Sequence, residues 1–183
     1  TTEIYTLSLH DALPISLVPD LYRGKVTVEA HEAQHLMSGL DFGDAATQDV
    51  RGAVQYLKTD SARVGVTGFC MGGALTLLAT AHVPEADAAS TWYGFPPLEY
   101  IDAGKIKIPV QGHFALDDTF FKSSTVEELE KSLKAAGVRL EFYRYKAGHA
   151  FANESGPFAA TAYKHDLAEL AWQRMLEFFG KTL

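Results

Sequence analysis

Short apolar runs alternate with longer segments in which apolar residues recur at helical spacing, from about residue 17 to the C-terminus. Short apolar runs bounded by turn residues are typical of buried strands, and the longer segments are typical of amphipathic helices. This alternation predicts βαβ units around a mostly parallel sheet. We therefore expect an α/β fold with a doubly wound sheet, whose functional sites lie beyond the carboxyl ends of its strands.

The expected strands are short and apolar, or alternate between apolar and polar residues: 15–18, 63–67, 88–93, 109–114 and 140–145. The expected helices have apolar stripes, and several have capping or stop residues: 41–58, 71–82, 123–136 and 158–179. We find no internal repeat and no low-complexity linker. Residues 17–183 are therefore predicted to form one domain.

Composition narrows the class of protein. The 183 residues are 47% hydrophobic, which is enough for one sizeable core. The formal net charge is −7, and no run of Lys or Arg could follow a phosphate backbone, so nucleic acid is not an expected partner. No stretch approaches the roughly 20 apolar residues of a membrane helix, and the N-terminus lacks the regions of a signal peptide. We expect a soluble, cytoplasmic protein whose oligomeric state is left open.

Residues 1–16 differ from the rest of the chain, because they have weak periodicity and no partner in the pattern of strands and helices. They resemble a translated sequencing adapter of the kind found at the ends of metagenomic open reading frames. On this interpretation natural sequence begins near Leu17, in a fold that lacks its first strands, and residues 1 to about 14 make few core contacts. The alternative is an ordinary N-terminal strand and turn.

Cys70 is the only cysteine, and it lies in the sequence Gly68-Phe-Cys-Met-Gly72 between an apolar strand and a helix. This is the setting of a nucleophile elbow, in which glycines allow a sharp, strained turn that exposes the central side chain. A helix N-terminus lowers the pKa of a thiol and favours the reactive thiolate. A lone cysteine is more often a buried apolar residue, and glycine-rich turns also bind phosphate, but the downstream residues favour a nucleophile.

His149 lies in a glycine-containing loop just after the strand predicted at 140–145, where an α/β-hydrolase carries its general base. Asp117 and Asp118 follow the strand predicted at 109–114, where the acid that orients the base belongs. Neighbouring residues of an extended segment face opposite sides, so only one of these carboxylates can point at His149. The chain order of nucleophile, acid and base is that of α/β-hydrolases.

Six motifs between about residue 15 and the C-terminus resemble those of dienelactone hydrolases: Pro19-Asp-Leu-Tyr22, Gly68-Phe-Cys-Met-Gly-Gly73, Tyr93-Gly94, residues 112–121, Gly148-His149-Ala150-Phe151 and Ala171-Trp-Gln-Arg174. The resemblance implies a hydrolase of small esters or lactones with Cys70, His149 and an aspartate as its catalytic triad. We favour Asp118 over Asp117, because in similar sequences the working aspartate precedes one residue and then a phenylalanine. The resemblance also implies four pocket residues, of which the first two could equally be core: Tyr93, Phe120, Phe151 and Asn153.

The resemblance implies that a dienelactone hydrolase proper clamps its substrate carboxylate with two arginines. Here the position four after His149 is Asn153, and residues 26–36 contain no Arg. A neutral ester or lactone therefore fits at least as well as a dienelactone. The reaction needs no metal or organic cofactor, and we assign no metal site and no other role to the remaining histidines: His10, His31, His35, His82, His113 and His165.

The oxyanion hole of this fold combines the backbone N–H after the nucleophile, here that of Met71, with a second N–H from the loop after the third strand. That loop precedes Ile15 in the family, so we expect it to be absent. Loss of one donor costs on the order of 100- to 1000-fold in rate. The alternative function is therefore a non-catalytic fragment or a partner-binding pseudoenzyme, in which these residues survive only by descent.

Overall fold

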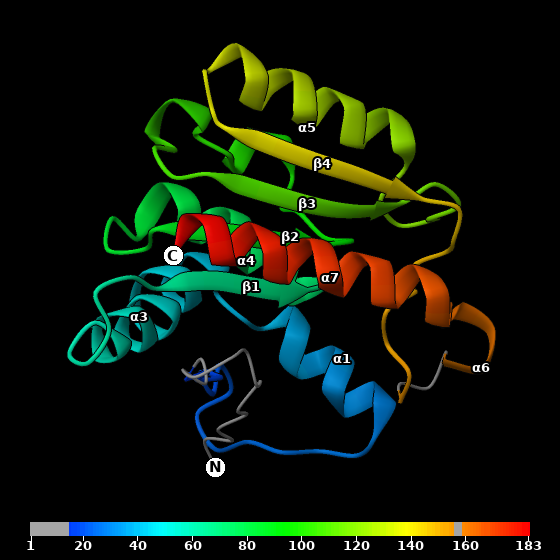
Figure 1. Ribbon diagram of the computed structural model, residues 1–183. Coiled ribbons are helices and arrows are strands. Elements are labelled where there is room, and N and C mark those ends of the chain that lie inside the picture. Colours follow the sequence, from blue (N-terminus) through cyan, green and yellow to red (C-terminus); the bar gives the residue numbers. More distant parts are fainter. Residues whose placement is uncertain (1–14, 156–158) are drawn as a thin grey trace.

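The computed structural model describes residues 15–155 and 159–183. Four strands form one sheet: β1 (Gly65–Phe69), β2 (Ala88–Trp92), β3 (Val110–Ala115) and β4 (Leu140–Tyr145). They lie side by side in chain order, and each neighbouring pair is parallel (Figure 1). The carboxyl ends of all four strands therefore meet at one end of the sheet, where the loops with Cys70, Asp118 and His149 begin.

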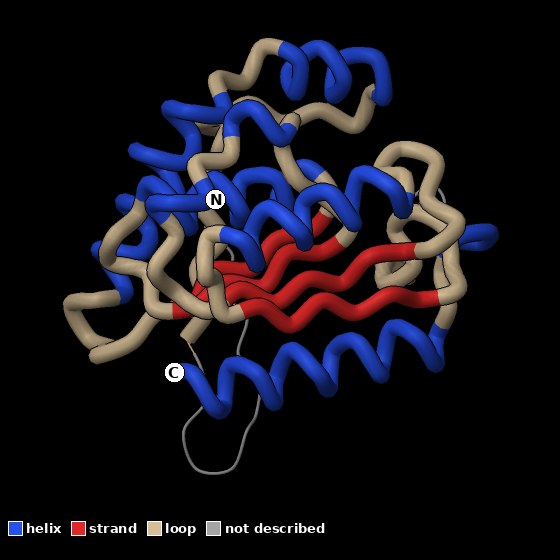
Figure 2. The backbone as a smooth tube through the Cα atoms, turned by 90° about the horizontal axis from the view of Figure 1, so that it is seen from above, coloured by secondary structure: helices blue, strands red, loops and turns tan. Residues whose placement is uncertain are grey.

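Helices cover both faces of the sheet. On one face lie α4 (Met71–His82) and α5 (Ser123–Ala135), and along the other runs α7 (His165–Thr182), which Figure 2 shows alone beneath the strands. This arrangement confirms the predicted doubly wound α/β class. The remaining helical elements are α1 (Ala30–Ser38), α2 (Phe42–Asp44), the π-helical η1 (Ala45–Val50), α3 (Arg51–Leu57), the 3₁₀ turns η2 (Leu98–Tyr100) and η3 (Ala103–Lys105), and α6 (Ala159–Ala162).

Two apolar clusters sandwich the sheet. Successive side chains of a strand point to opposite faces, so β3 contributes to both clusters. Val110 and Phe114 face α4 and α5, where they pack with Leu77, Leu129 and others. Ala115 faces α7, where it belongs to a cluster with Trp92 and Met175. The second cluster lies directly beneath the loops at the carboxyl ends of the strands.

Most elements after residue 60 lie within two residues of their predicted bounds. The strands predicted at 63–67, 88–93, 109–114 and 140–145 and the helices predicted at 71–82 and 123–136 are confirmed. The helix predicted at 41–58 is also present, as an uninterrupted helical run through α2, η1 and α3. Its π-helical middle section was not predicted.

Two predictions were wrong, and one helix was missed. Residues 15–18 form only an isolated bridge at Ile15, because no described strand lies beside them to take up their backbone hydrogen bonds. The long last helix is interrupted at Lys164, which has extended backbone and donates its N–H to the carbonyl of Phe151 at 2.9 Å. Helix α1 was missed because it buries no residue, so the apolar pattern gave no signal for it.

Two N-terminal predictions lie largely outside the described residues. These are the assignment of residues 1–16 to a separate, adapter-like segment and the expectation that residues 1 to about 14 make few core contacts. The structure describes only Ile15 and Ser16 of that segment. Both statements stay predictions, as does the start of the hydrolase domain at Leu17.

We expect the substitution Leu133→Ala to lower the free energy of unfolding by about 2–5 kcal/mol, because Leu133 is fully buried between α5 and β3 and its loss leaves a cavity. Leu170→Ala on α7 is the matched control, since that side chain is 39% exposed. It should change the free energy of unfolding by less than about 1 kcal/mol. Urea denaturation measures both. Equal losses in the two variants would contradict the assigned core.

Candidate active site

Cys70 joins β1 to α4 through a strained turn with φ 53° and ψ −114°. Its backbone N–H donates to the carbonyl of Trp92 at 2.9 Å, and its carbonyl accepts the N–H of Ala74 at 3.2 Å. A positive φ at a residue with a side chain costs on the order of 1–3 kcal/mol and persists only where the surroundings enforce it. The turn leaves the thiol exposed above the sheet.

Two glycines make this turn possible, because at each of them another backbone segment comes so close that no side chain would fit. A Cβ atom at Gly68 would collide with the carbonyl group of Gly72, and a Cβ atom at Gly94 would collide with the carbonyl group of Cys70. Backbone atoms cannot swing aside as a side chain can, so a side chain at either position would displace the turn. These collisions give the glycine-rich pattern around Cys70 a physical reason.

His149 lies between Cys70 and Asp118. Its Nε2 atom is 3.2 Å from Cys70 Sγ, and its Nδ1 atom is 2.8 Å from Asp118 Oδ2. Asp118 Oδ1 accepts the backbone N–H groups of Phe120 and Phe121 at 2.8 and 3.1 Å. The carboxylate, whose side chain is only 1% exposed, therefore has both oxygens hydrogen-bonded.

Asp117 points away from this group of residues. It pairs with Lys146 at 2.7 Å, and half of its side chain is exposed. The structure thus places Asp118 beside His149, as the sequence favoured, and it places Asp117 on the surface. Neighbouring carboxylates on an extended segment face opposite sides, which explains why only one of them reaches the imidazole.

Backbone hydrogen bonds join the loops that carry Asp118 and His149. The N–H of Leu116 donates to the carbonyl of Tyr145 at 2.8 Å, and the N–H of Asp117 donates to the carbonyl of Ala147 at 2.9 Å. These bonds continue the pairing of β3 with β4 beyond the strand ends. The pairing of the two strands therefore sets the distance between the segments that carry Asp118 and His149.

The three side chains shift one another's protonation. The hydrogen bond to His149 lowers the pKa of Cys70, although burial opposes this shift, and the backbone N–H of Met71 lowers it further. Burial alone would lower the pKa of His149, but hydrogen bonds to Asp118 and Cys70 outweigh it and raise that pKa to about 9. Both shifts favour a Cys70 thiolate paired with a His149 imidazolium over the two neutral groups.

Aromatic rings surround the His149 imidazole. Tyr93 meets it edge-on with ring centroids 5.2 Å apart, Phe120 lies at 4.9 Å, and Phe121 stacks on it at 5.8 Å. The backbone here is strained at Tyr93 and Ala150, with φ values of 36° and 59°. Among the described residues, three of the four non-glycine residues with positive φ, including Cys70, belong to this site.

The four predicted pocket residues differ in exposure. Phe120 is 75% exposed beside the imidazole, and Asn153 is exposed in the loop after His149. Tyr93 and Phe151 are buried and contact each other, so they support the site from beneath. Phe121 was not singled out from the sequence; its position next to Phe120, three residues after the acid, was the available signal. Pocket roles for the four residues stay predictions.

A sequence profile of the dienelactone hydrolase family matches residues 15–183. The chain belongs to the dienelactone hydrolase family. Among its relatives are "Protein usf" of Aquifex pyrophilus, 31% identical over 177 residues that cover 92% of this chain and 75% of the relative. The "Putative carboxymethylenebutenolidase" of Methylorubrum extorquens is 34% identical over 132 residues, 67% of this chain and 44% of the relative. The chain thus spans about half the length of this and several other curated relatives.

A solved structure from the family has the same fold. The crystal structure of a "Putative Dienelactone Hydrolase" from Klebsiella pneumoniae subsp. pneumoniae superimposes with a TM-score of 0.78 at 28% sequence identity, over 91% of this chain and 75% of the other. The dienelactone hydrolase fold is therefore found in the part of the chain that the structure describes.

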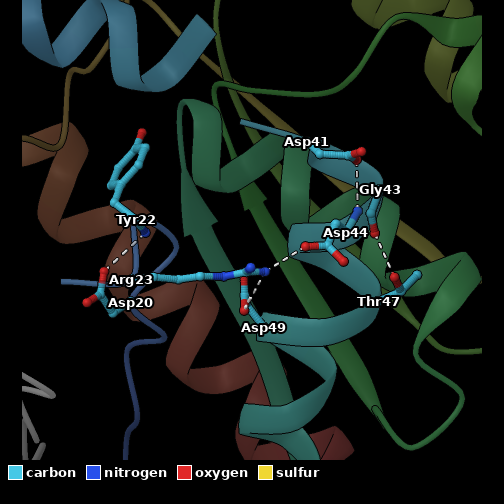
Figure 3. Close-up of polar contacts among 8 residues, drawn as sticks. All are labelled: Asp20, Tyr22, Arg23, Asp41, Gly43, Asp44, Thr47 and Asp49. Carbon is cyan, nitrogen blue, oxygen red and sulfur yellow. Dashed lines mark hydrogen bonds and ion pairs between the residues drawn. The ribbon is translucent and has the colours of Figure 1, made fainter. Parts of the chain in front are cut away.

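The turn that contains the dienelactone hydrolase motif Pro19-Asp-Leu-Tyr22 lies against the elbow. Arg23 reaches from this turn to Asp44 at 2.6 Å and to Asp49 at 3.8 Å, as Figure 3 shows. The two carboxylates are five residues apart, a spacing that a π-helix, with its i to i+5 hydrogen bonds, brings onto one side. Tyr22 donates its hydroxyl to the Sδ atom of Met71, the residue directly after Cys70, at 3.5 Å.

Within residues 15–155 and 159–183, no group of three or more His, Cys, Asp or Glu residues is arranged to hold a metal ion. The same part of the chain contains no helix long and apolar enough to cross a bilayer.

We expect iodoacetamide to alkylate Cys70 at pH 6.5 at least about tenfold faster in the wild type than in His149→Gln, because loss of the imidazole removes the main influence that lowers the thiol pKa. A drop of one pKa unit corresponds to about a tenfold gain in thiolate. His165→Gln, which changes an exposed histidine, is the control and should match the wild type. A wild-type rate that titrates near an ordinary thiol pKa of about 8.5 would contradict the arrangement.

Proposed function

We propose that this chain is a hydrolase of small carboxylic esters or lactones with Cys70 as its nucleophile. The observation that carries the proposal is the position of His149, which is hydrogen-bonded to Cys70 Sγ on one side and to the buried Asp118 carboxylate on the other. A nucleophile in contact with a base that a third group orients is the signature of covalent catalysis.

The first half-reaction forms an acyl-enzyme. The Cys70 thiolate attacks the carbonyl carbon, and the carbonyl π electrons move to oxygen to give a tetrahedral oxyanion. Met71 offers its backbone N–H at the N-terminus of α4, close to where this charge develops. When the oxyanion collapses, the C–O bond of the ester breaks, and the His149 imidazolium gives its proton to the departing alkoxide.

The second half-reaction releases the acid. Neutral His149 removes a proton from water, whose oxygen attacks the thioester carbon. Collapse of this second oxyanion breaks the C–S bond and returns the thiolate, and the imidazolium is restored. Asp118 stays ionised throughout, because its carboxylate fixes the orientation of the ring and stabilises the imidazolium. Every proton transfer is made by side chains of this chain, so the proposed reaction needs no metal or organic cofactor.

The surroundings of the site favour a neutral substrate. The position four after His149 is Asn153, which cannot pair with a carboxylate as an arginine does. Lys146, the cation nearest in sequence to His149, is already paired with Asp117. Phe120 adds an exposed apolar surface beside the imidazole. We therefore propose neutral esters or lactones as substrates.

We also propose the cytoplasm as the location of the protein, because the Cys70 thiol must remain reduced to act as the nucleophile.

We expect Asp118→Asn to lower kcat for p-nitrophenyl acetate by about 10³- to 10⁴-fold, because an amide leaves His149 in the wrong tautomer. The matched control is Asp117→Asn, which makes the same chemical change one residue away and should leave kcat within about twofold. Cys70→Ala should abolish turnover.

Equal effects of the Asp117 and Asp118 substitutions on kcat would contradict the proposal. Turnover that survives in Cys70→Ala would contradict it as well. A folded wild type without turnover on a panel of neutral esters and lactones would favour the non-catalytic alternative.

A further inference from the structure

A chain of hydrogen bonds runs beneath the loop that carries His149. Arg174 on α7 donates from Nη1 to the hydroxyl of Tyr145 at 3.2 Å. The Tyr145 hydroxyl lies 2.8 Å from His113 Nδ1, and His113 Nε2 lies 2.8 Å from Gln111 Oε1. The chain therefore links α7 to the last residue of β4 and, through His113 and Gln111, to the interior of β3.

The two ends of the chain set the direction of its bonds. The Gln111 side-chain oxygen can only accept, so the ring proton of a neutral His113 lies on Nε2, and Nδ1 accepts the hydroxyl proton of Tyr145. A guanidinium can only donate, so the Tyr145 oxygen accepts from Arg174. His113 is fully buried, and burial together with Arg174 lowers its pKa to about 3. The ring is therefore neutral and held in one tautomer.

Further contacts fix Arg174 itself. Its guanidinium carbon lies 4.2 Å from the centre of the Tyr143 ring, which is a cation–π arrangement. Its backbone carbonyl accepts the side-chain amide of Gln111 at 3.1 Å. Arg174 is thus held from β4 through its guanidinium and from β3 through its backbone. A side chain held in this way can itself hold another side chain in place.

Tyr145 is the residue at which β4 ends and the His149 loop begins. Its carbonyl accepts the N–H groups of Leu116 and Ala147, which lie in the acid loop and the His149 loop. Its ring packs against Phe151 at the far end of the His149 loop, with ring centroids 4.8 Å apart. Tyr145 therefore contacts both ends of the segment 146–151.

This segment needs external support. Ala150, directly after His149, has a φ of 59°, a conformation that persists only when the surrounding structure imposes it. The backbone N–H of Lys164 also holds the carbonyl of Phe151. A loop that is strained at the residue after its functional histidine will relax when one of its anchors is released.

We propose that Arg174 is a positioning residue: by fixing the Tyr145 hydroxyl, it holds the 146–151 loop in the geometry in which His149 bonds both Cys70 and Asp118. This inference rests on the proposed function. It extends that function by assigning a role to a side chain that touches none of the reacting atoms. The residue acts through Tyr145 and Phe151.

The test compares Arg174→Met, Tyr145→Phe and the double variant with the wild type. Tyr145→Phe removes a single oxygen atom, so it tests the hydroxyl with little risk to folding. Arg144→Met is the matched control, because it also removes a hydrogen-bonded arginine; Arg144 lies on β4 next to Tyr145, but it pairs with Glu130. The measurements are kcat and KM for p-nitrophenyl acetate, the pH profile of Cys70 alkylation, Tm, and ¹⁵N chemical shifts of the His113 ring.

Both single variants should lower kcat about tenfold or more at nearly unchanged KM, because misplacement of a catalytic group by about 1 Å can cost as much as 100-fold. The Cys70 alkylation profile should move toward that of an ordinary thiol. The double variant should be no worse than Tyr145→Phe alone, since the two residues act in one chain. His113 should be a neutral Nε2–H tautomer in the wild type, and its Nδ1 chemical shift should move in Tyr145→Phe, because that atom loses its hydrogen bond while Nε2 keeps its bond to Gln111. Arg144→Met should change Tm alone.

Variants that lower Tm as the control does, with kcat and the alkylation profile unchanged, would overturn the positioning role. The pH profile of Cys70 alkylation can be measured without turnover. If the wild type hydrolyses no ester but the profile still shifts in the variants, the positioning role is supported and only the proposed ester substrate is wrong. A wild-type thiol with an ordinary profile would overturn the proposed function and the positioning role together.

Discussion

The hydrogen bond between Asp118 Oδ2 and His149 Nδ1 is the contact on which the chemistry of this site depends. A buried carboxylate is costly unless it is hydrogen-bonded and paired, and Asp118 meets both conditions with two backbone N–H groups and one imidazole. The carboxylate favours the protonated ring, and the protonated ring favours the thiolate of Cys70. The buried Asp118 carboxylate therefore favours, through His149, the ionised form of the exposed Cys70 thiol.

The fold supplies this contact by bringing three loops to one end of a parallel sheet. Cys70 follows β1, Asp118 follows β3 and His149 follows β4. Backbone hydrogen bonds between the last two loops set the distance from Asp118 to His149. The strained residues of the site, Cys70, Tyr93 and Ala150, are distributed over these loops and the one after β2. Tyr93 and Ala150 pack in the cluster between the sheet and α7, and Cys70 is held by its backbone hydrogen bonds to Trp92 and Ala74.

The sequence predicted what depends on local pattern. Strands β1 to β4 and helices α4 and α5 followed from their apolar spacing, and the elbow at Cys70 followed from its glycines. The choice of Asp118 over Asp117 came from resemblance and agrees with the geometry. The hydrogen-bonded chain from Arg174 to Gln111 could not be predicted, because its members come from three elements and no local spacing links them. Residues 15–18 were predicted as a strand from apolarity alone, but a strand also requires a neighbour, and no described strand lies beside them.

A trapped acyl-enzyme tests the nucleophile most directly. The protein is mixed with p-nitrophenyl acetate, and the reaction is quenched in acid within the first turnover. The protein is then digested, and the masses of its peptides are measured by mass spectrometry. The account predicts one acetyl group on the peptide that contains Cys70, at a yield that falls sharply in His149→Gln, because the thiolate is lost with the imidazolium. Acetylation of a different residue, or an equal yield at Cys70 with and without His149, would contradict it.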